Sequence, residues 1–114
     1  MMTIDALQQF GANTREGLGR CMNNEAFYLR LVNISLNDAS FEKLEAAVKD
    51  GDRKAAFEAA HALKGVMGNL SLTPLYEAVS EMTELLRADK DADYPALLDD
   101  ILQKRGALLA LRGD

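Results

Sequence analysis

The sequence predicts an all-α protein, folded as an antiparallel up-down-up-down four-helix bundle with a short N-terminal helical cover. Apolar residues recur at helical spacing through most of the chain, and no segment shows the alternation typical of strands. Proline occurs only twice, and residues that favour helices are common. The helical segments are joined by short polar turns, so consecutive helices should lie side by side and run in opposite directions.

The N-terminal cover should occupy about residues 3–20. Thr3 is a suitable N-cap for a short helix that ends at Gly11. The segment 13–21 is ambiguous, because Gly17 and Gly19 disfavour a helix there.

The bundle should occupy about residues 24–112 of a single domain that spans 1–114. Its first helix is predicted over Asn24–Asn37. The inward stripe of this helix is expected to consist of Phe27, Leu31 and Ile34, with Tyr28, Val32 and Leu36 beside it.

A shorter helix follows up to Lys49, with Ser40 as its N-cap, and we count it as an extension of the first. Asp52 should cap a helix that ends near Leu70 or Ser71.

Thr73 and Pro74 should open the next helix, with Thr73 as cap and Pro74 in the first turn. The last helix should begin at Tyr94. Arg105 lies on its apolar stripe, which indicates a snorkelling or paired arginine.

Composition limits the function. The formal net charge is −5 and no basic stripe is present, so we expect no nucleic-acid partner. A single cysteine, Cys21, can form neither an internal disulfide nor a metal site, which suits a reducing cytoplasm. We find no signal peptide and no membrane-spanning run, and we expect a cytoplasmic monomer.

The most informative stretch lies within the helix that Asp52 begins. It contains His61, the only histidine of the chain. At about 100° per residue, the apolar stripe of this helix centres on Leu63, and His61 lies about 160° away on the outer face. Gly65 and Gly68 share that face, and Lys64 stands at its edge.

A lone histidine is often a surface bystander, but here its neighbours matter. Two glycines within a helix cost about 1 kcal/mol each relative to alanine, and outward glycines are not explained by packing. They would allow a large partner to approach the imidazole of His61, while Lys64 would supply positive charge.

The stretch His61–Leu70 resembles the H-x-L-K-G-x-x-G-x-L signature of histidine-containing phosphotransfer (HPt) domains of bacterial phosphorelays. The resemblance extends to Gly17–Arg20, to Asn24–Leu31 and to Leu44–Asp52, and it covers roughly residues 4–111. Many members carry a further glycine where this chain has Ser71, a small residue, so we expect the difference to matter little.

The resemblance implies that His61 accepts a phosphoryl group, through Nε2, from an aspartate of a response-regulator receiver domain or of a hybrid histidine kinase. It would then pass the group to another receiver. The Mg²⁺ needed for transfer would lie in the receiver, so this chain needs no cofactor and has no metal site.

The sequence contains no nucleotide-binding glycine motif, so it is expected to be a relay intermediate and neither a kinase nor another enzyme. Phe57 is an unusual outward residue one turn before His61. We interpret Phe57 and Glu58, with Gly65 and Gly68, as a surface that binds the partner. Partial burial of Phe57 against a neighbouring helix is the alternative.

Two alternative functions stay open. The chain could be a helical docking or adaptor module in which His61 is a bystander. It could also be the phosphoacceptor domain of a larger chemotaxis-type kinase, although the initial methionine and the length favour a free-standing protein. An enzyme of another class is a more distant third reading.

Overall fold

The computed structural model describes residues 1–112, and within them it contains helices and no strands. The helices in chain order are α1 (Ile4–Phe10), α2 (Thr14–Arg20), α3 (Glu25–Ser35), α4 (Ser40–Asp50), α5 (Arg53–Asn69), α6 (Thr73–Arg87) and α7 (Tyr94–Ala110). The predicted all-helical class is therefore confirmed for this part of the chain.

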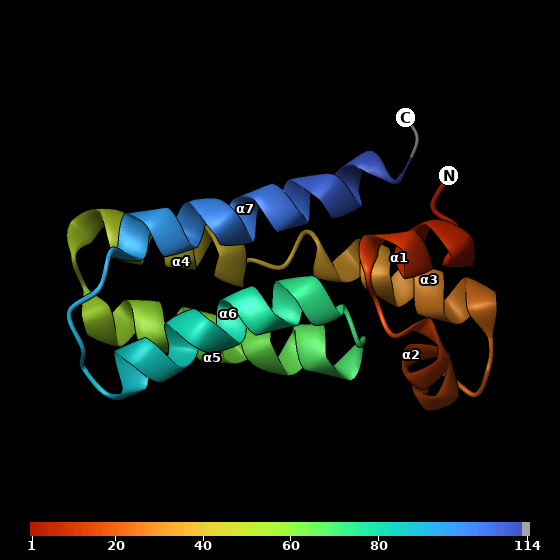
Figure 1. Cartoon of the computed structure of the whole chain (residues 1–114), viewed down its shortest axis with the longest axis horizontal. Coiled ribbons are helices and arrows are strands. Elements are labelled where there is room, and N and C mark those ends of the chain that lie inside the picture. The colour runs from red at the N-terminus through yellow and green to blue at the C-terminus, as the bar shows by residue number, and fades with distance from the viewer. Residues whose placement is uncertain (113–114) are drawn as a thin grey trace.

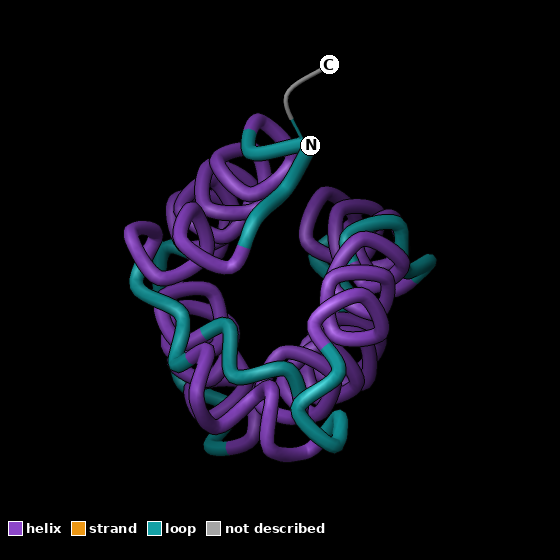
Figure 2. Tube along the Cα trace, turned by 90° about the vertical axis from the view of Figure 1, so that its right-hand side faces the viewer, coloured by secondary structure: helices purple, strands orange, loops and turns teal. Residues whose placement is uncertain are grey.

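Four helices make up the body of the molecule. Helix α5 packs against α4 and α6, α6 packs against α7, and α7 also contacts α4. Helices α1, α2 and α3 gather at one end of this body (Figure 1), and the view turned by 90° shows the helices arranged around a common axis (Figure 2). Large side chains that are fully buried fill the interior, including Leu44, Leu63, Met67, Leu75, Met82, Ile101 and Leu108.

Several helix starts follow the predicted capping chemistry. The side chain of Thr3 accepts the Ala6 N–H at 3.1 Å, and that of Asp52 accepts the Ala55 N–H at 3.1 Å. Gly11 ends α1 with a left-handed φ of 113°.

Two predicted caps are wrong. Helix α4 already includes Ser40, whose backbone N–H donates to the Asp38 carboxylate at 2.8 Å. Helix α6 already includes Thr73, and its N-cap position, Leu72, provides no side-chain bond. Each helix begins slightly earlier than predicted because backbone bonds reach back from its first turn, as from Tyr76 N–H to Leu72 O.

The ambiguous segment is a helix, α2, capped by the side chain of Asn13. Gly17 is buried against the ring of Tyr28, where an added Cβ would lie 2.6 Å from ring atoms. This glycine therefore permits a close helix contact, and the packing with α3 outweighs its low helix propensity.

The predicted inward stripe of α3 is wrong for Phe27 and Ile34, whereas Leu31, its third member, is partly buried against the core. Phe27 is 47% exposed and Ile34 is 58% exposed, whereas Tyr28 and Val32 are completely buried. Helix α3 lies at the end of the body, so only the face that carries Tyr28 and Val32 meets a neighbour.

Arg105 is a paired arginine, one of the two readings of its place on the apolar stripe. Its Nε–H donates to the carbonyl of Leu36 at 2.8 Å, and its guanidinium lies 4.6 Å from the centre of the Phe41 ring. The side chain thereby connects α7 to the junction between α3 and α4.

Candidate functional site

Helix α5 presents His61 to solvent, as its position in the helical repeat predicts. Ala60 and Leu63 on the inner face are completely buried, while His61, Glu58 and Gly65 are exposed. The buried face of α5 packs on α4 and α6, so the opposite face is available to another protein.

The ring of His61 stacks on Phe57, one turn earlier in α5. The ring centroids are 5.6 Å apart and the ring planes differ by 18°. Arg87 of α6 lies over the Phe57 ring at 5.0 Å. Phe57 is half-buried and contacts α6, so the alternative reading, partial burial against a neighbouring helix, holds, while its part in partner binding stays a prediction.

Lys64 is paired with a carboxylate. Its Nζ donates to Glu84 at 3.0 Å, and the other oxygen of Glu84 accepts from Arg87 Nε at 3.1 Å. These hydrogen bonds, the one from Lys64 first, hold the pKa of Glu84 below its usual value. Lys64 and Arg87 therefore share one carboxylate, and the spacing along the sequence does not predict the roles of Glu84 and Arg87.

The two glycines of the motif differ in their surroundings. A Cβ added at Gly65 would meet open space, which fits the prediction of bare backbone beside His61. A Cβ at Gly68 would lie 3.1 Å from the Tyr76 ring, so packing against α6 explains part of this glycine. The expectation that packing explains neither glycine is therefore wrong for Gly68.

A shallow hollow of about 350 Å³ runs along this face. It is lined by His61, Lys64, Gly65, Gly68, Asn69, Tyr76 and Arg20. Arg20 comes from α2, which is far away in the sequence, and Tyr76 comes from α6. The Gly17–Arg20 segment was noted in the sequence, but only the tertiary fold shows that it reaches this face.

Ser71, which stands where many family members carry glycine, has a larger structural role than we expected from its small size. Its backbone is left-handed, with a φ of 56°, in the turn that follows α5. Its hydroxyl donates to Glu16 at 2.7 Å and accepts from Arg20 Nη1 at 2.7 Å. A glycine would adopt this backbone more easily, but it would lack the hydroxyl that bonds to Glu16 and Arg20 of α2.

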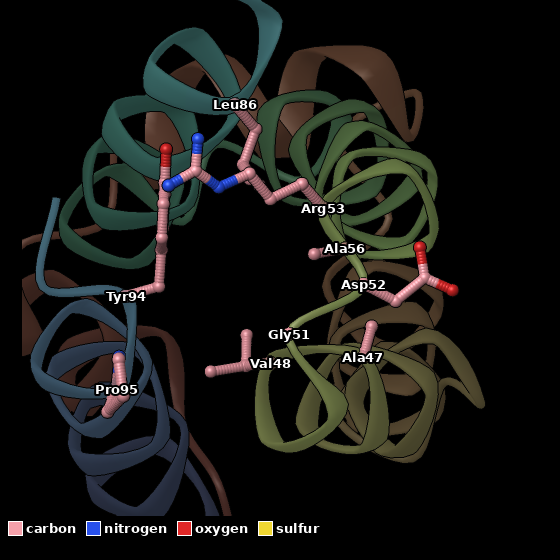
Figure 3. A pocket seen from close by; sticks show the side chains of 9 residues that line it. All are labelled: Ala47, Val48, Gly51, Asp52, Arg53, Ala56, Leu86, Tyr94 and Pro95. Carbon is pink, nitrogen blue, oxygen red and sulfur yellow. The ribbon is translucent and has the colours of Figure 1, made fainter. Parts of the chain in front are cut away.

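A second hollow, of about 290 Å³, is lined by other residues, where α4 turns into α5 and α7 begins (Figure 3). Val48, Leu86 and Tyr94 give it an apolar lining, and Arg53 reaches across toward the Tyr94 ring, 5.5 Å away. None of its lining residues is a histidine or a cysteine. The histidine that could act as a nucleophile lies in the other hollow, around His61.

The profile of the Hpt domain family matches residues 34–113. The chain belongs to this family. No curated protein and no solved structure matches the chain significantly. Hpt domains act in phosphotransfer within phosphorelay signalling, together with the receiver domains of response regulators. Helices α1 and α2 and most of α3 precede the matched region.

Two kinds of feature are absent from the described residues. Residues 1–112 contain no group of three or more His, Cys, Asp or Glu side chains that could hold a metal ion. Within the same residues, no helix has the length and apolar character needed to cross a bilayer.

Proposed function

We propose that His61 is the phosphoacceptor of this Hpt domain. It would take a phosphoryl group from an aspartate of one receiver domain and pass it to an aspartate of another. The observation that carries the proposal is the exposed His61 on α5, stacked on Phe57 and followed by Lys64 and the open backbone of Gly65.

The transfer is a substitution at phosphorus. In the neutral imidazole, Nδ1 carries the proton and the lone pair of Nε2 attacks the phosphorus. The N–P bond forms as the P–O bond to the aspartate breaks, and the aspartate leaves as a free carboxylate. The reverse sequence on a second receiver delivers the group and restores the imidazole.

Stabilisation of the phosphoryl charge is assigned to Lys64, with help from the Mg²⁺ of the receiver. Lys64 stands one turn after His61, and helical side chains lean toward the N-terminus, so we expect its ammonium to be able to reach a phosphoryl group on His61. To contact the phosphoryl oxygens it must share or leave its bond to Glu84.

The chain would act as an intermediate without kinase activity, because its sequence contains no nucleotide-binding glycine motif. We also infer an antiparallel up-down-up-down bundle in which α3 and α4 together count as the first helix and α5, α6 and α7 follow; the short connections and mutual contacts of α4 to α7 support it. We propose that the domain works as a monomer, because one face of one chain provides the histidine, the lysine and the open backbone.

Phosphoramidate, a small phosphoryl donor, provides a test that needs no partner. The purified protein should gain the mass of one phosphoryl group, and the label should survive alkali and disappear in acid, as a phosphoramidate bond does. His61→Gln should gain none. An unlabelled wild-type protein that is shown to be folded would instead favour the docking or adaptor function.

A further inference from the structure

Arg20 joins α2 to the carboxyl end of the helix that carries His61. Its Nη1 donates to the carbonyls of Gly68 at 3.0 Å and Asn69 at 3.1 Å, in addition to the bond to Ser71. Its Nη2 lies 3.1 Å from the carboxylate of Glu16. The side chain nevertheless remains 47% exposed and lines the hollow beside His61.

The position of Arg20 places it within reach of a protein that covers His61. Gly68 follows His61 by seven residues, about two turns or roughly 10 Å along α5, and therefore lies on the same face. A protein interface of standard size covers about 800 Å² on each partner, equivalent to a disc of roughly 16 Å radius. A partner centred on His61 would thus extend as far as Arg20.

Arg20 is poorly placed to contact the phosphoryl group itself. Side chains of a helix lean toward its N-terminus, and the stacking on Phe57 turns the His61 ring the same way. Arg20 lies in the opposite direction, at the carboxyl end of α5. Its positive charge is therefore available to the body of the partner.

We infer that Arg20 is a docking residue for the receiver domain, and that it pairs with a carboxylate on the face of the receiver that surrounds its phosphorylated aspartate. The inference rests on the proposed function of His61. A guanidinium matches a carboxylate in shape and charge. Helix α2 lies outside the region that the family profile matches, so the match itself does not assign this contact.

Glu16 competes with the partner for this guanidinium. It pairs with Arg20 and accepts from the hydroxyl of Ser71, and these contacts, the one from Ser71 first, lower its pKa. Glu16 therefore stays ionised at neutral pH and masks part of the charge of Arg20. A receiver carboxylate must share or displace it, so removing Glu16 should favour docking even though it weakens the network.

The competition between Glu16 and the partner makes it possible to tell whether Arg20 binds the partner or only stabilises the fold. Removing Glu16 should favour docking in the first case and should not in the second. The test compares Arg20→Ala and Glu16→Gln, with Arg15→Ala, an exposed arginine of the same helix, as the control. For each protein, the rate of phosphorylation by a receiver charged with acetyl phosphate is divided by the rate with phosphoramidate. The receiver is one that exchanges with the wild-type protein, and thermal melting checks that each variant is folded.

Arg20→Ala should lower the ratio by up to about fivefold, the most that one exposed ion pair is worth, and the effect should shrink in high salt. Glu16→Gln should raise the ratio, and Arg15→Ala should leave it unchanged. If both Arg20→Ala and Glu16→Gln lower the ratio, or if Arg20→Ala leaves it unchanged, the inference is wrong. Failure of the proposed function would be distinguishable, because the wild-type protein would then accept no phosphoryl group from either donor.

Discussion

Replacing Gly65 with alanine tests why a glycine stands beside His61. An added methyl group would meet no other atom within 4 Å, and α5 is regular at this position. Alanine should therefore raise the free energy of unfolding by about 1 kcal/mol, the difference in helix propensity. With an unfolding entropy of about 2.1 cal/mol/K per residue over 114 residues, this corresponds to a rise in Tm of roughly 4 °C.

The same substitution should impair phosphotransfer, because the methyl group occupies space that the partner needs. Crowding one methyl group into a packed contact costs about 1 kcal/mol or more, so the receiver-driven rate should fall about fivefold or more relative to the phosphoramidate rate. The two assays are a thermal melt and the ratio of these two rates, measured on the same preparation.

Gly106 offers a matched control. Like Gly65, it is exposed, lies four residues before the last residue of its helix, and has no atom within 4 Å of an added Cβ. Gly106→Ala should give the same gain in stability and no change in the rate ratio. The reasoning is refuted if Gly65→Ala stabilises the protein and leaves the ratio unchanged, or if it destabilises the fold.

Three further variants test the surroundings of the site. Glu84→Gln should release Lys64 to the phosphoryl group and slow the hydrolysis of phosphohistidine, measured by ³¹P NMR. Tyr28→Phe should lower the free energy of unfolding by about 1–2 kcal/mol in urea titrations, because the buried hydroxyl donates to Leu70 O at 2.7 Å. Gly17→Ala should cost about 1–3 kcal/mol in the same titrations, because its Cβ would overlap the Tyr28 ring.

Tyr28 also predicts a pH dependence. Burial raises the pKa of its phenol to about 12, above the usual value of 10, so the folded state favours the protonated form. The resulting stability is complete below pH 10 and is lost as the pH rises through about 12. Comparison with Tyr28→Phe isolates this loss, and a wild-type protein that loses no more stability than the variant over this range would contradict the assignment.

Controls make the other variants interpretable. Glu81→Gln removes an exposed carboxylate from the same helix as Glu84, so it should leave the lifetime of phosphohistidine unchanged. Equal lifetimes in Glu84→Gln and the wild-type protein would show that the ion pair does not restrain Lys64. A Gly17→Ala protein as stable as the wild type would show that α2 can move away from Tyr28 without cost.

The sequence was most informative where one helix determines the answer. The helical repeat is sufficient to place His61 outward and Leu63 inward, and the local chemistry of Asp52 identifies the start of α5. The periodicity failed for Phe27 and Ile34, because both faces of α3 carry apolar residues and only the packing decides which is buried.

Long-range contacts could not be read from the sequence. Arg20 is separated from Gly68 by 48 residues, and its place in the hollow depends on how α2 folds against the end of α5. Ser71 looked like a small substitution, but its left-handed backbone and its bonds to Glu16 become visible only in three dimensions. The ion pair between Lys64 and Glu84 could not be predicted from the sequence either, because the two residues lie on different helices that meet only in the fold.

The most direct test of the central claim follows a phosphoryl group from a receiver to this protein. A receiver domain is charged with acetyl phosphate, freed of excess donor and mixed with the folded protein, and the phosphoryl group is then located by tandem mass spectrometry. The account predicts that the group leaves the receiver aspartate and appears on His61, and that His61→Gln acquires none. A group found on another residue, or equal labelling of His61→Gln, would contradict it.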